Sequence, residues 1–504
     1  MDGLVHQTQE TSSIRVPSLL QALTPLAVLV LLLSLSVWFF GADSSQGANQ
    51  IALILSACVA ALVAIRNGES WSDIQEAIVR GISTAMAAIL ILFAIGALIG
   101  TWSLAGTVPA MIYYGLKVLS PTVFYPTACL ICAFTSVAIG SSWTTAGTLG
   151  IGLMGIAQGL GLSPEITAGA VISGAYFGDK MSPLSDTTNL APAVAGTELF
   201  THIRHMAWTT GPSFIIALVL FTAVGLTGSG HEGAASLGDM PAVLEERFNL
   251  SVFTLVPLLA VLGLALARFP ALPVILFGAI LGAVFAAVLQ PDLVAAYGGA
   301  PDLPSGWAML KGAWIALFDG YSADTGNALV DDLLSRGGMS SVLTTIWLIL
   351  SALTFGAVME HAGMLQRIIQ GVIRSAKSTG ALISAVVFTS IGTNVATGDQ
   401  YIAIVLPGRM FRAEFRRRRL KARNLSRSIE DAGTLTSPLI PWNTCGAYMS
   451  TTLGVATLAY LPWCFLNLVN PLIAILYGMR GFTIQRIPEG EPIPEIDVED
   501  RTPA

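Results

Sequence analysis

Long apolar stretches, separated by short polar ones, run through the whole sequence. Many of them approach the roughly 20 residues that a helix needs to cross the hydrocarbon core of a bilayer. We therefore predict uninterrupted spanning helices at residues 19–40, 51–65, 83–104, 207–226, 252–267, 271–289, 342–360 and 461–478.

Four further apolar stretches contain Gly, Pro, Ser, Thr and Asn in their interiors: residues 121–160, 164–198, 380–407 and 428–460. Polar groups at membrane depth are costly, so interruptions of this kind usually line a water-filled path or a binding site. We expect the function of the chain to lie in these stretches.

The composition supports a membrane location. The 504 residues are 54% hydrophobic and 11% charged, whereas a soluble domain has about 25% charged residues. Strand-like alternation is absent, so the predicted fold is an all-α polytopic membrane protein and not a β-barrel. The sequence has no nucleotide-binding loop, no Gly-x-Ser-x-Gly and no His-x-x-x-His motif. We therefore predict neither an enzyme nor a bound cofactor.

The interrupted stretches indicate an internal duplication. Ser437-Pro-Leu439 follows Ser182-Pro-Leu184 by 255 residues, and the stretch Gly392–Asp399 aligns with Gly140–Gly147. In this alignment Asp399 occupies the position of Gly147. Interrupted helices at matching positions of two repeats are the best sequence indication of a transporter binding site.

A topology follows if residues 121–160 and 380–407 are re-entrant hairpins. Each half then has five crossings, and this odd number inverts the second half relative to the first. The prediction is two inverted-topology repeats with about ten crossings, two re-entrant hairpins and two broken helices. With the N-terminus inside, the basic run Arg409–Arg427 is cytoplasmic, as the positive-inside rule requires. We expect Arg416–Arg419 to contact anionic lipid headgroups and not nucleic acid.

This topology divides the chain into five parts. Residues 1–18 and 480–504 are cytoplasmic tails, residues 19–227 and 251–479 are the two transmembrane repeats, and residues 228–250 are an extracytoplasmic linker. The predicted protein is a multi-pass protein of the cell inner membrane with both termini in the cytoplasm.

The densest polar cluster surrounds Pro183, which removes a backbone donor and breaks the helix, thereby freeing carbonyl oxygens. We expect Asp186 to be buried at the bilayer midplane as the coupling carboxylate, with Asp179 next and Lys180 paired with Asp179. Oxygen ligands suit a small cation, by extension from the rule for Ca²⁺ and Mg²⁺. A polar loop outside the membrane, in which Asp186 caps a helix, is the alternative. The other expected ligands here are Ser182, Ser185, Thr187, Thr188 and Asn189.

The hairpin tips and the second break supply further candidates. Ser/Thr-rich turns often have only a local role, but each tip would meet a break if hairpin and broken helix packed together. The expected ion-binding residues are Ser141, Ser142 and Thr145 at the first tip, Thr393, Asn394 and Asp399 at the second, and Ser437 and Asn443 at the second break.

Several other titratable residues have two interpretations. Glu430 and Asp431 precede the second break, and they are either first-turn acids near the cytoplasmic face or part of a gate or proton relay. His202, His205 and His361 are expected at the membrane interface and not as proton carriers.

The longest of these motifs carries a resemblance. Gly178-Asp-Lys-Met-Ser-Pro-Leu-Ser-Asp-Thr-Thr-Asn-Leu-Ala-Pro192, followed by Thr201-His-Ile-Arg-His-Met206, resembles the NhaC-type sodium/proton antiporters. Gly140–Gly147 and Gly433–Asn443 also fit this family, so that the resemblance extends over nearly the whole chain. It implies an ion-coupled transporter with inverted repeats. The family is not uniform in substrate, because some members resemble exchangers of malate and lactate and others are associated with amino acids.

Two functions therefore stay open. The first is antiport of Na⁺ and H⁺, in which a midplane carboxylate binds one ion or the other. The second is Na⁺- and H⁺-coupled transport or exchange of small organic acids or amino acids, for which Lys180 would bind a substrate carboxylate. Na⁺ and H⁺ are the expected partners in both cases. The sequence leaves open the stoichiometry and the oligomeric state, a homodimer included.

Overall fold

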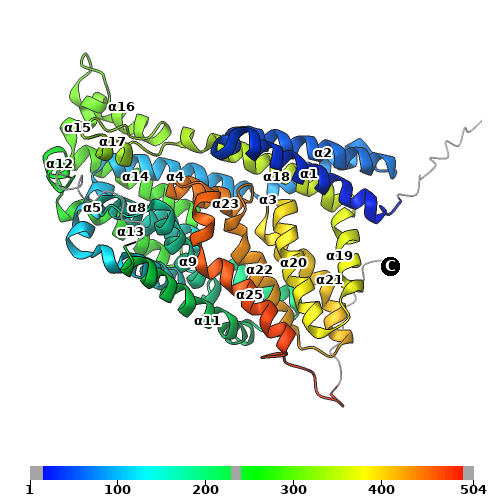
Figure 1. The fold of residues 1–504 in the computed structure, drawn as a ribbon. Coiled ribbons are helices and arrows are strands. Elements are labelled where there is room, and N and C mark those ends of the chain that lie inside the picture. Colours follow the sequence, from blue (N-terminus) through cyan, green and yellow to red (C-terminus); the bar gives the residue numbers. More distant parts are fainter. Residues whose placement is uncertain (1–14, 229–239, 492–504) are drawn as a thin grey trace, which may run out of the picture.

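The computed structural model describes residues 15–228 and 240–491, and these residues are almost entirely helical (Figure 1). The first half contains α1 (Leu19–Phe40), α2 (Ala48–Arg66), α3 (Trp71–Thr84), α4 (Met86–Leu104), α5 (Thr107–Val118), α6 (Phe124–Ile139), α7 (Ser142–Thr145), α8 (Ile151–Gly159), α9 (Pro164–Met181), α10 (Asp186–Ala195) and α11 (Leu199–Leu226). A short turn η1 (Gly41–Gln46) joins α1 to α2, and a π-helical turn η3 (Ala146–Gly150) lies between α7 and α8.

The second half follows the same plan with additional short helices. It contains α12 (Met240–Arg247), α13 (Val256–Leu266), α14 (Ala271–Leu289), α15 (Pro291–Tyr297), α16 (Ser305–Phe318), α17 (Ala328–Leu334), α18 (Leu343–His361), α19 (Met364–Ser375), α20 (Thr379–Thr397), α21 (Gln400–Arg417), α22 (Ala422–Thr436), α23 (Thr444–Leu453), α24 (Thr457–Tyr460) and α25 (Phe465–Arg480). A turn η7 (Ser437–Leu439) extends α22.

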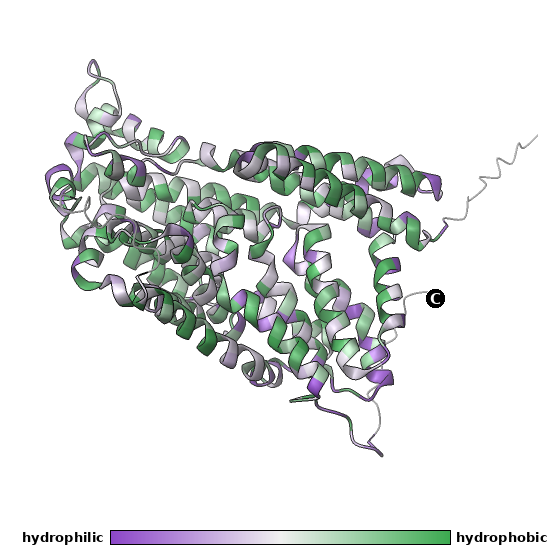
Figure 2. Ribbon diagram, viewed as in Figure 1, coloured by the Kyte–Doolittle hydropathy of each residue, from purple (hydrophilic) through white to green (hydrophobic). Residues whose placement is uncertain are grey.

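Six of the eight predicted spans coincide with long apolar helices, and the other two, 252–267 and 461–478, fall in bent helix pairs. Two further helices of this kind, Pro121–Ile139 and Thr379–Thr397, lie in the stretches predicted as re-entrant hairpins. Within the described residues, eight helices are long and apolar enough to cross a membrane, and the number rises to ten if each of two bent pairs is one span. Apolar residues cover the flanks of these helices, while polar residues gather at their ends (Figure 2). The all-α polytopic membrane fold is thus confirmed. The predicted tails and linker lie partly outside the described residues, in 1–14, 229–239 and 492–504.

The helix boundaries repeat at a constant spacing. Positions 140 and 398, 185 and 443, and 196 and 454 differ by 258 in each case. Gly140 and Gly398 end α6 and α20 in the left-handed conformation, with φ of +79° and +66°. Ser185 and Asn443 cap α10 and α23. The chain therefore has an internal repeat, as expected, with a spacing of 258 residues where about 255 was predicted, and this difference changes which residues are aligned.

The error came from the Ser-Pro-Leu triplets. In the first repeat this triplet begins where α9 ends, whereas in the second repeat it forms the turn η7 that continues α22. The corrected register places Asp399 opposite Ser141 and not Gly147, and Ser437 opposite Asp179 and not Ser182. Turn geometry fixes the register because a left-handed φ strongly favours glycine.

The two repeats pack in a reciprocal way. α4 of the first half lies along α14 of the second, and α18 of the second lies along α2 of the first. α9 and α22 contact each other near the centre of the molecule, where α25 also packs (Figure 1). The two broken helices, one from each repeat, are thus brought together in the interior.

Four shorter helices, α3, α5, α16 and α19, were missed by the sequence prediction. They have 12 to 14 residues each, which is too short to cross a bilayer. α3 and α19 have one apolar and one polar face, so a search for long apolar stretches passes over them.

Candidate ion-binding site at the two helix breaks

The first break lies between α9 and α10. Ser163 caps the start of α9 by accepting the N–H of Ile166 at 3.2 Å. At the other end, Pro183 lacks a backbone N–H, and the helix stops after Met181. Ser185 restarts it as α10 by accepting the N–H of Thr188 at 3.4 Å. The unwound residues 182–185 therefore lie between two half-helix ends.

Asp179 is the buried carboxylate at this break. The residue is only 5% exposed. Ser142, from the start of α7, donates a hydrogen bond to Asp179 Oδ2 at 2.6 Å. The other oxygen, Oδ1, has no hydrogen-bond partner among the described residues. The first hairpin tip thus meets the first broken helix as predicted, and one carboxylate oxygen is left free to bind a cation.

Further oxygens surround Asp179. The Thr188 hydroxyl lies 3.1 Å from the carbonyl oxygens of both Asp179 and Lys180. Ser185 Oγ lies 3.1 Å from Thr187 Oγ1, and Ser182, Ser185, Thr187 and Thr188 are all buried. Such a set of hydroxyl, carbonyl and carboxylate oxygens is what a hard cation prefers.

Asp186 differs from the prediction. It lies at the first turn of α10 and is exposed and not buried. Asp186 Oδ1 accepts the N–H of Thr187 at 2.8 Å, and Tyr401 of α21 donates a hydrogen bond to Oδ2. Asn189, one turn further on, is also exposed and donates to the carbonyl oxygen of Ser185 at 2.6 Å.

The second break lies between η7 and α23, and side-chain amides hold it together. Asn394 of α20 donates to the carbonyl oxygen of Gly433 at 2.6 Å and to Thr436 Oγ1 at 3.1 Å. Asn443 donates to Asn394 Oδ1 at 3.0 Å and caps α23 by accepting the N–H of Cys445 at 3.0 Å. The predicted residues Asn394 and Asn443 therefore lie together, but they use their hydrogen-bonding groups for each other and for the nearby backbone.

Equivalent contacts in the two repeats differ in charge. Ser142 and Asp179 of the first repeat correspond to Gln400 and Ser437 of the second, where Ser437 donates to Gln400 Oε1 at 2.9 Å. The same contact is therefore made twice, once with a carboxylate and once with neutral groups. A negative charge for a cation is provided at this position only in the first repeat.

The remaining predicted tip residues make hydrogen bonds within or at the ends of their own helices. Asp399 is buried and accepts the N–H of Ile402 at 2.9 Å, just as Ser141 accepts that of Thr144 at 3.1 Å. Thr145 donates to the carbonyl oxygen of Ser141 at 2.9 Å. Thr393 donates to that of Thr389 at 2.8 Å, four residues earlier in α20.

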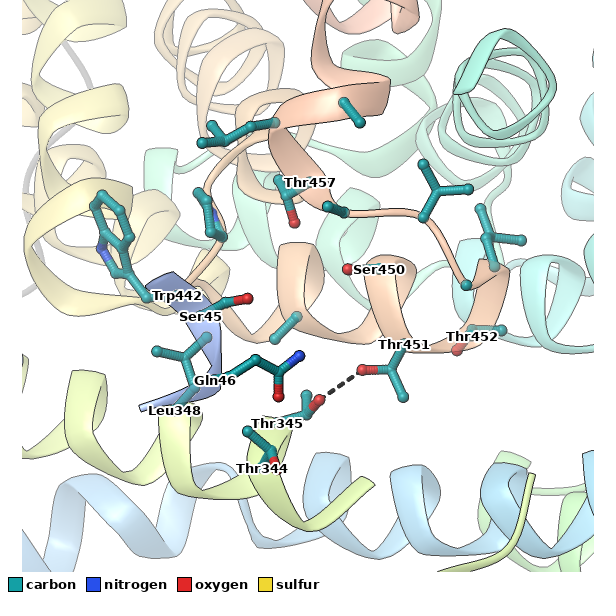
Figure 3. A pocket seen from close by; sticks show the side chains of 18 of the residues that line it. Ser45, Gln46, Thr344, Thr345, Leu348, Trp442, Ser450, Thr451, Thr452 and Thr457 are labelled. Carbon is teal, nitrogen blue, oxygen red and sulfur yellow. Dashed lines mark hydrogen bonds between the residues drawn. The ribbon is translucent and has the colours of Figure 1, made fainter. Parts of the chain in front are cut away.

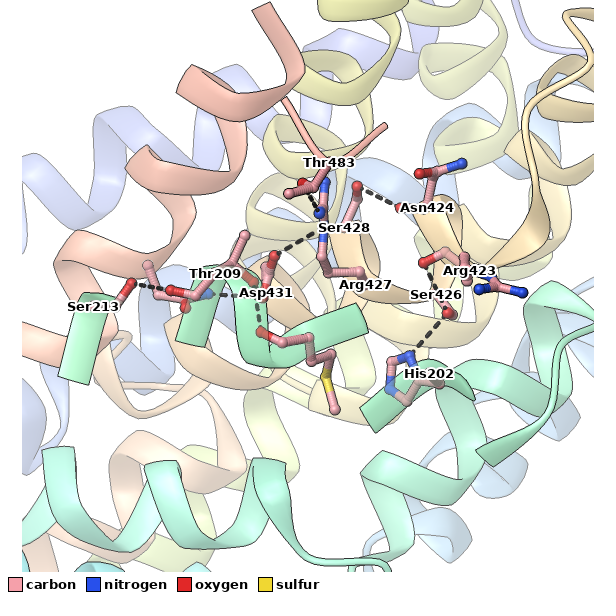
Figure 4. Close-up of polar contacts among 12 residues, drawn as sticks. His202, Thr209, Ser213, Arg423, Asn424, Ser426, Arg427, Ser428, Asp431 and Thr483 are labelled. Atoms are coloured by element: carbon pink, nitrogen blue, oxygen red, sulfur yellow. Dashed lines mark hydrogen bonds and ion pairs between the residues drawn. The ribbon is translucent and has the colours of Figure 1, made fainter. Parts of the chain in front are cut away.

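Lys180 does not pair with Asp179, which corrects the prediction. Its ammonium group pairs with Asp431 of α22, and both side chains are fully buried. Asp431 also accepts hydrogen bonds from Thr209 Oγ1 at 3.0 Å and Asn470 Nδ2 at 2.8 Å, and Arg427 lies 3.9 Å away (Figure 4). This cluster joins α9, α11, α22 and α25.

The same region contains four other titratable residues. Glu430 and Asp431 are the ninth and tenth residues of α22 and are fully buried, so they are not first-turn acids. His202 and His205 are buried in the first two turns of α11, and His202 Nδ1 lies 2.8 Å from Ser426 Oγ.

Two cavities of unequal size flank the breaks. The larger, of about 1380 Å³, extends from η1 and α18 to α23 and includes Trp442 (Figure 3). The smaller, of about 230 Å³, includes Ser141, Leu184 and Arg268. Leu184 and Trp442 occupy equivalent positions of the two repeats, 258 residues apart. These two positions relate the cavities through the repeat, and one cavity is about six times larger than the other.

The sequence matches known proteins over most of its length. Residues 174–482, which contain both breaks, match the model of the Na⁺/H⁺ antiporter family. The chain is 40% identical over 434 residues to the Na⁺/H⁺ antiporter NhaC of Alkalihalophilus pseudofirmus, covering 86% of this chain and 90% of that protein. The chain belongs to the Na⁺/H⁺ antiporter family. The resemblance noted from its motifs is confirmed, and the protein is a secondary transporter of the membrane.

Other members of the family carry other names. A malate-2H⁺/Na⁺-lactate antiporter of Bacillus subtilis is 36% identical over 470 residues, covering 93% of this chain and 96% of that protein. The arginine/ornithine antiporter ArcD of Halobacterium salinarum is 36% identical over 481 residues, covering 94% and 95%.

Some residues that join the two repeats were not found from the sequence. Besides Tyr401, which contacts Asp186, Trp143 of α7 stacks on Tyr448 of α23 with ring centroids 4.0 Å apart. Each hairpin tip therefore contacts the half-helix of the other repeat. Gln400 and Tyr401 directly follow Asp399 in an interrupted stretch, and this position was the one sequence feature that could have indicated their contacts.

Proposed function

We propose that this protein exchanges Na⁺ for H⁺ across the membrane and that Asp179 is the carboxylate to which either ion binds. The observation that carries this proposal is the free oxygen Asp179 Oδ1. It lies beside the Ser142 hydroxyl and the oxygens of the first break, at a position where the second repeat has the neutral Ser437. Asp186 lies at the exposed edge of the same break, where it would attract cations.

Coupling follows from the cost of burying a charge. An empty, ionised Asp179 is disfavoured in the interior, whereas a bound Na⁺ or a proton neutralises it. The transporter would therefore change conformation only when one ion is bound. Alternate opening of the two repeat-related cavities would then expose Asp179 first to one side and then to the other.

The proposed topology places both termini and the basic run in the cytoplasm, and residues 228–250 outside. The larger cavity would then open to the outside. The structure also limits the proposed lipid contact at Arg416–Arg419. Arg418 pairs with Glu414 at 2.5 Å, and Arg419 donates to the carbonyl oxygen of Glu491 at 2.8 Å. Arg417 also pairs with Glu414, at 2.7 Å, so that Arg416 is left as the residue for anionic headgroups.

A second candidate function is coupled exchange of a small organic ion. It is favoured by the volume of about 1380 Å³ in the larger cavity, which exceeds what Na⁺ needs. However, Lys180 no longer supports this function, because it is occupied by Asp431.

One experiment separates the two functions. The purified protein is reconstituted in liposomes with a pH dye inside, and Na⁺ is added, followed by malate, lactate, arginine and ornithine in separate trials. Na⁺/H⁺ exchange predicts a pH change with Na⁺ alone. A pH change that requires one of the organic ions would favour the second function, and no response to any of them would contradict both.

A further inference from the structure

A second buried carboxylate lies near the site and has no assigned role. Glu430, on α22, is fully buried, and neither of its carboxylate oxygens has a hydrogen-bond partner in the described part of the chain. Its neighbour Asp431 has several partners. The hydroxyl of Thr434, one helical turn after Glu430, is also buried without a partner. A buried carboxylate without donors is stable only if it takes up a proton or a cation.

The charges around Glu430 come from two helices. Lys180 and Asp179 on α9 and Asp431 on α22 itself act on it electrostatically. α11, which also packs on α22, carries the buried His202 and His205. The charged or titratable residues on the other helices packed against α22 are Asp186 on α10, Tyr401, Arg409, Arg412, Glu414, Arg416 and Arg417 on α21, and Tyr477 and Arg480 on α25, while α20 has none.

The buried charges of the two broken helices do not balance. On α9 and α22 the buried acids are Asp179, Glu430 and Asp431, and the buried bases are Lys180 and Arg427. Three acids against two bases leave one negative charge in excess. A single bound cation, either Na⁺ or a proton, neutralises the cluster, and it need not bind at the same carboxylate in both cases.

We propose that Glu430 is the residue that takes up the proton, while Na⁺ binds at Asp179. The two ions then compete through the shared charge of the cluster, with Lys180 between them, and not for one set of ligands. This inference rests on the proposed Na⁺/H⁺ exchange and keeps Asp179 as the Na⁺-binding carboxylate, but it moves the proton from Asp179 to Glu430.

The test measures Na⁺ affinity as a function of pH by equilibrium binding of ²²Na⁺ to the purified protein. If one proton leaves for each Na⁺ bound, the wild-type Kd rises about tenfold for each pH unit below the midpoint of the titration. Glu430→Gln mimics the protonated residue, so its affinity for Na⁺ should be weak and nearly independent of pH. Glu76→Gln, at an exposed acid, should keep the wild-type curve.

Glu430→Asp keeps a titrating group but moves it, so it should retain the slope and shift the midpoint. This variant decides the matter if Glu430→Gln binds too little Na⁺ to measure. A wild-type pH dependence in Glu430→Gln, or a wild-type midpoint in Glu430→Asp, would overturn the role of Glu430 and leave the proposed exchange intact. Absence of Na⁺ binding to the wild-type protein would instead overturn the proposed function and this inference with it.

Discussion

Lys180 and Asp431 form a fully buried ion pair that joins the two broken helices. The two residues are 251 positions apart in sequence, yet each lies within a few residues of the break in its own repeat. Lys180 is next to Asp179, so the ion pair fixes the end of α9 that carries the proposed ion-binding carboxylate. If one broken helix moves relative to the other, this ion pair must either break or move with both helices.

Unequal effects are expected when the two partners are removed one at a time. Breaking a buried pair by removing one partner typically costs about 3–5 kcal/mol. Lys180→Met leaves Asp431 with Arg427, Thr209 and Asn470, whereas Asp431→Leu leaves two cations without their carboxylate. We predict that Asp431→Leu lowers the thermal unfolding temperature in detergent more than Lys180→Met does. The double variant should lose less in unfolding temperature than the two single variants lose together. If the losses simply add, the ion pair contributes nothing to stability.

The glycines at the helix turns provide a test of the repeat register. Gly398 has φ of +66°, and an added Cβ would lie 2.9 Å from Ala352 Cβ. A non-glycine residue in this conformation costs about 1–2 kcal/mol before any clash. Gly392, in the middle of α20, has no atom within 4 Å of an added Cβ. Gly398→Ala should therefore lower the unfolding temperature, and Gly392→Ala should not. The opposite order would support the register that aligned Gly392 with Gly140.

The unequal cavities predict unequal access. Single cysteines at Thr451, in the larger cavity, and Thr144, in the smaller one, would be introduced into a variant in which the native cysteines are replaced. A membrane-impermeant thiol reagent added outside intact cells should modify Thr451→Cys at least tenfold faster than Thr144→Cys. Modification of Thr451→Cys only after the cells are permeabilised would contradict the proposed orientation.

The basic run gives a separate test of topology. Cysteines placed at exposed Ala413 or at Arg417 should react only from the cytoplasmic side, because arginine-rich loops stay inside. Labelling of either position from the outside of intact cells would reverse the proposed arrangement of both repeats.

The sequence predicted what depends on local pattern. Apolar length located the spanning helices, and Pro183 and the Ser-rich segment after it located the first break. Ser142 was correctly placed near that break, because a polar turn inside an apolar stretch is costly unless it lines a site.

What the sequence did not predict depends on packing between distant segments. The partner of Lys180 could not be found, because Asp431 reaches it only through contact between α9 and α22. The exposure of Asp186 depends on how α10 is oriented after the break, which composition does not fix. The repeat register was missed because it is set by the left-handed turns at Gly140 and Gly398, whereas the similar Ser-Pro-Leu triplets belong to different local structures.

The central claim is that Asp179 is the carboxylate that binds Na⁺ during the exchange of Na⁺ for H⁺. Asp179→Asn keeps the size of the side chain and removes its charge, while Asp399→Asn does the same at a buried carboxylate that caps a helix. The decisive measurement is the rate of Na⁺-dependent proton movement in proteoliposomes, with each variant compared at equal protein content. We predict that Asp179→Asn lowers the rate at least a hundredfold, equivalent to about 2.7 kcal/mol, that Asp186→Asn lowers it less, and that Asp399→Asn remains within tenfold of the wild type. Wild-type exchange by folded Asp179→Asn would contradict the account.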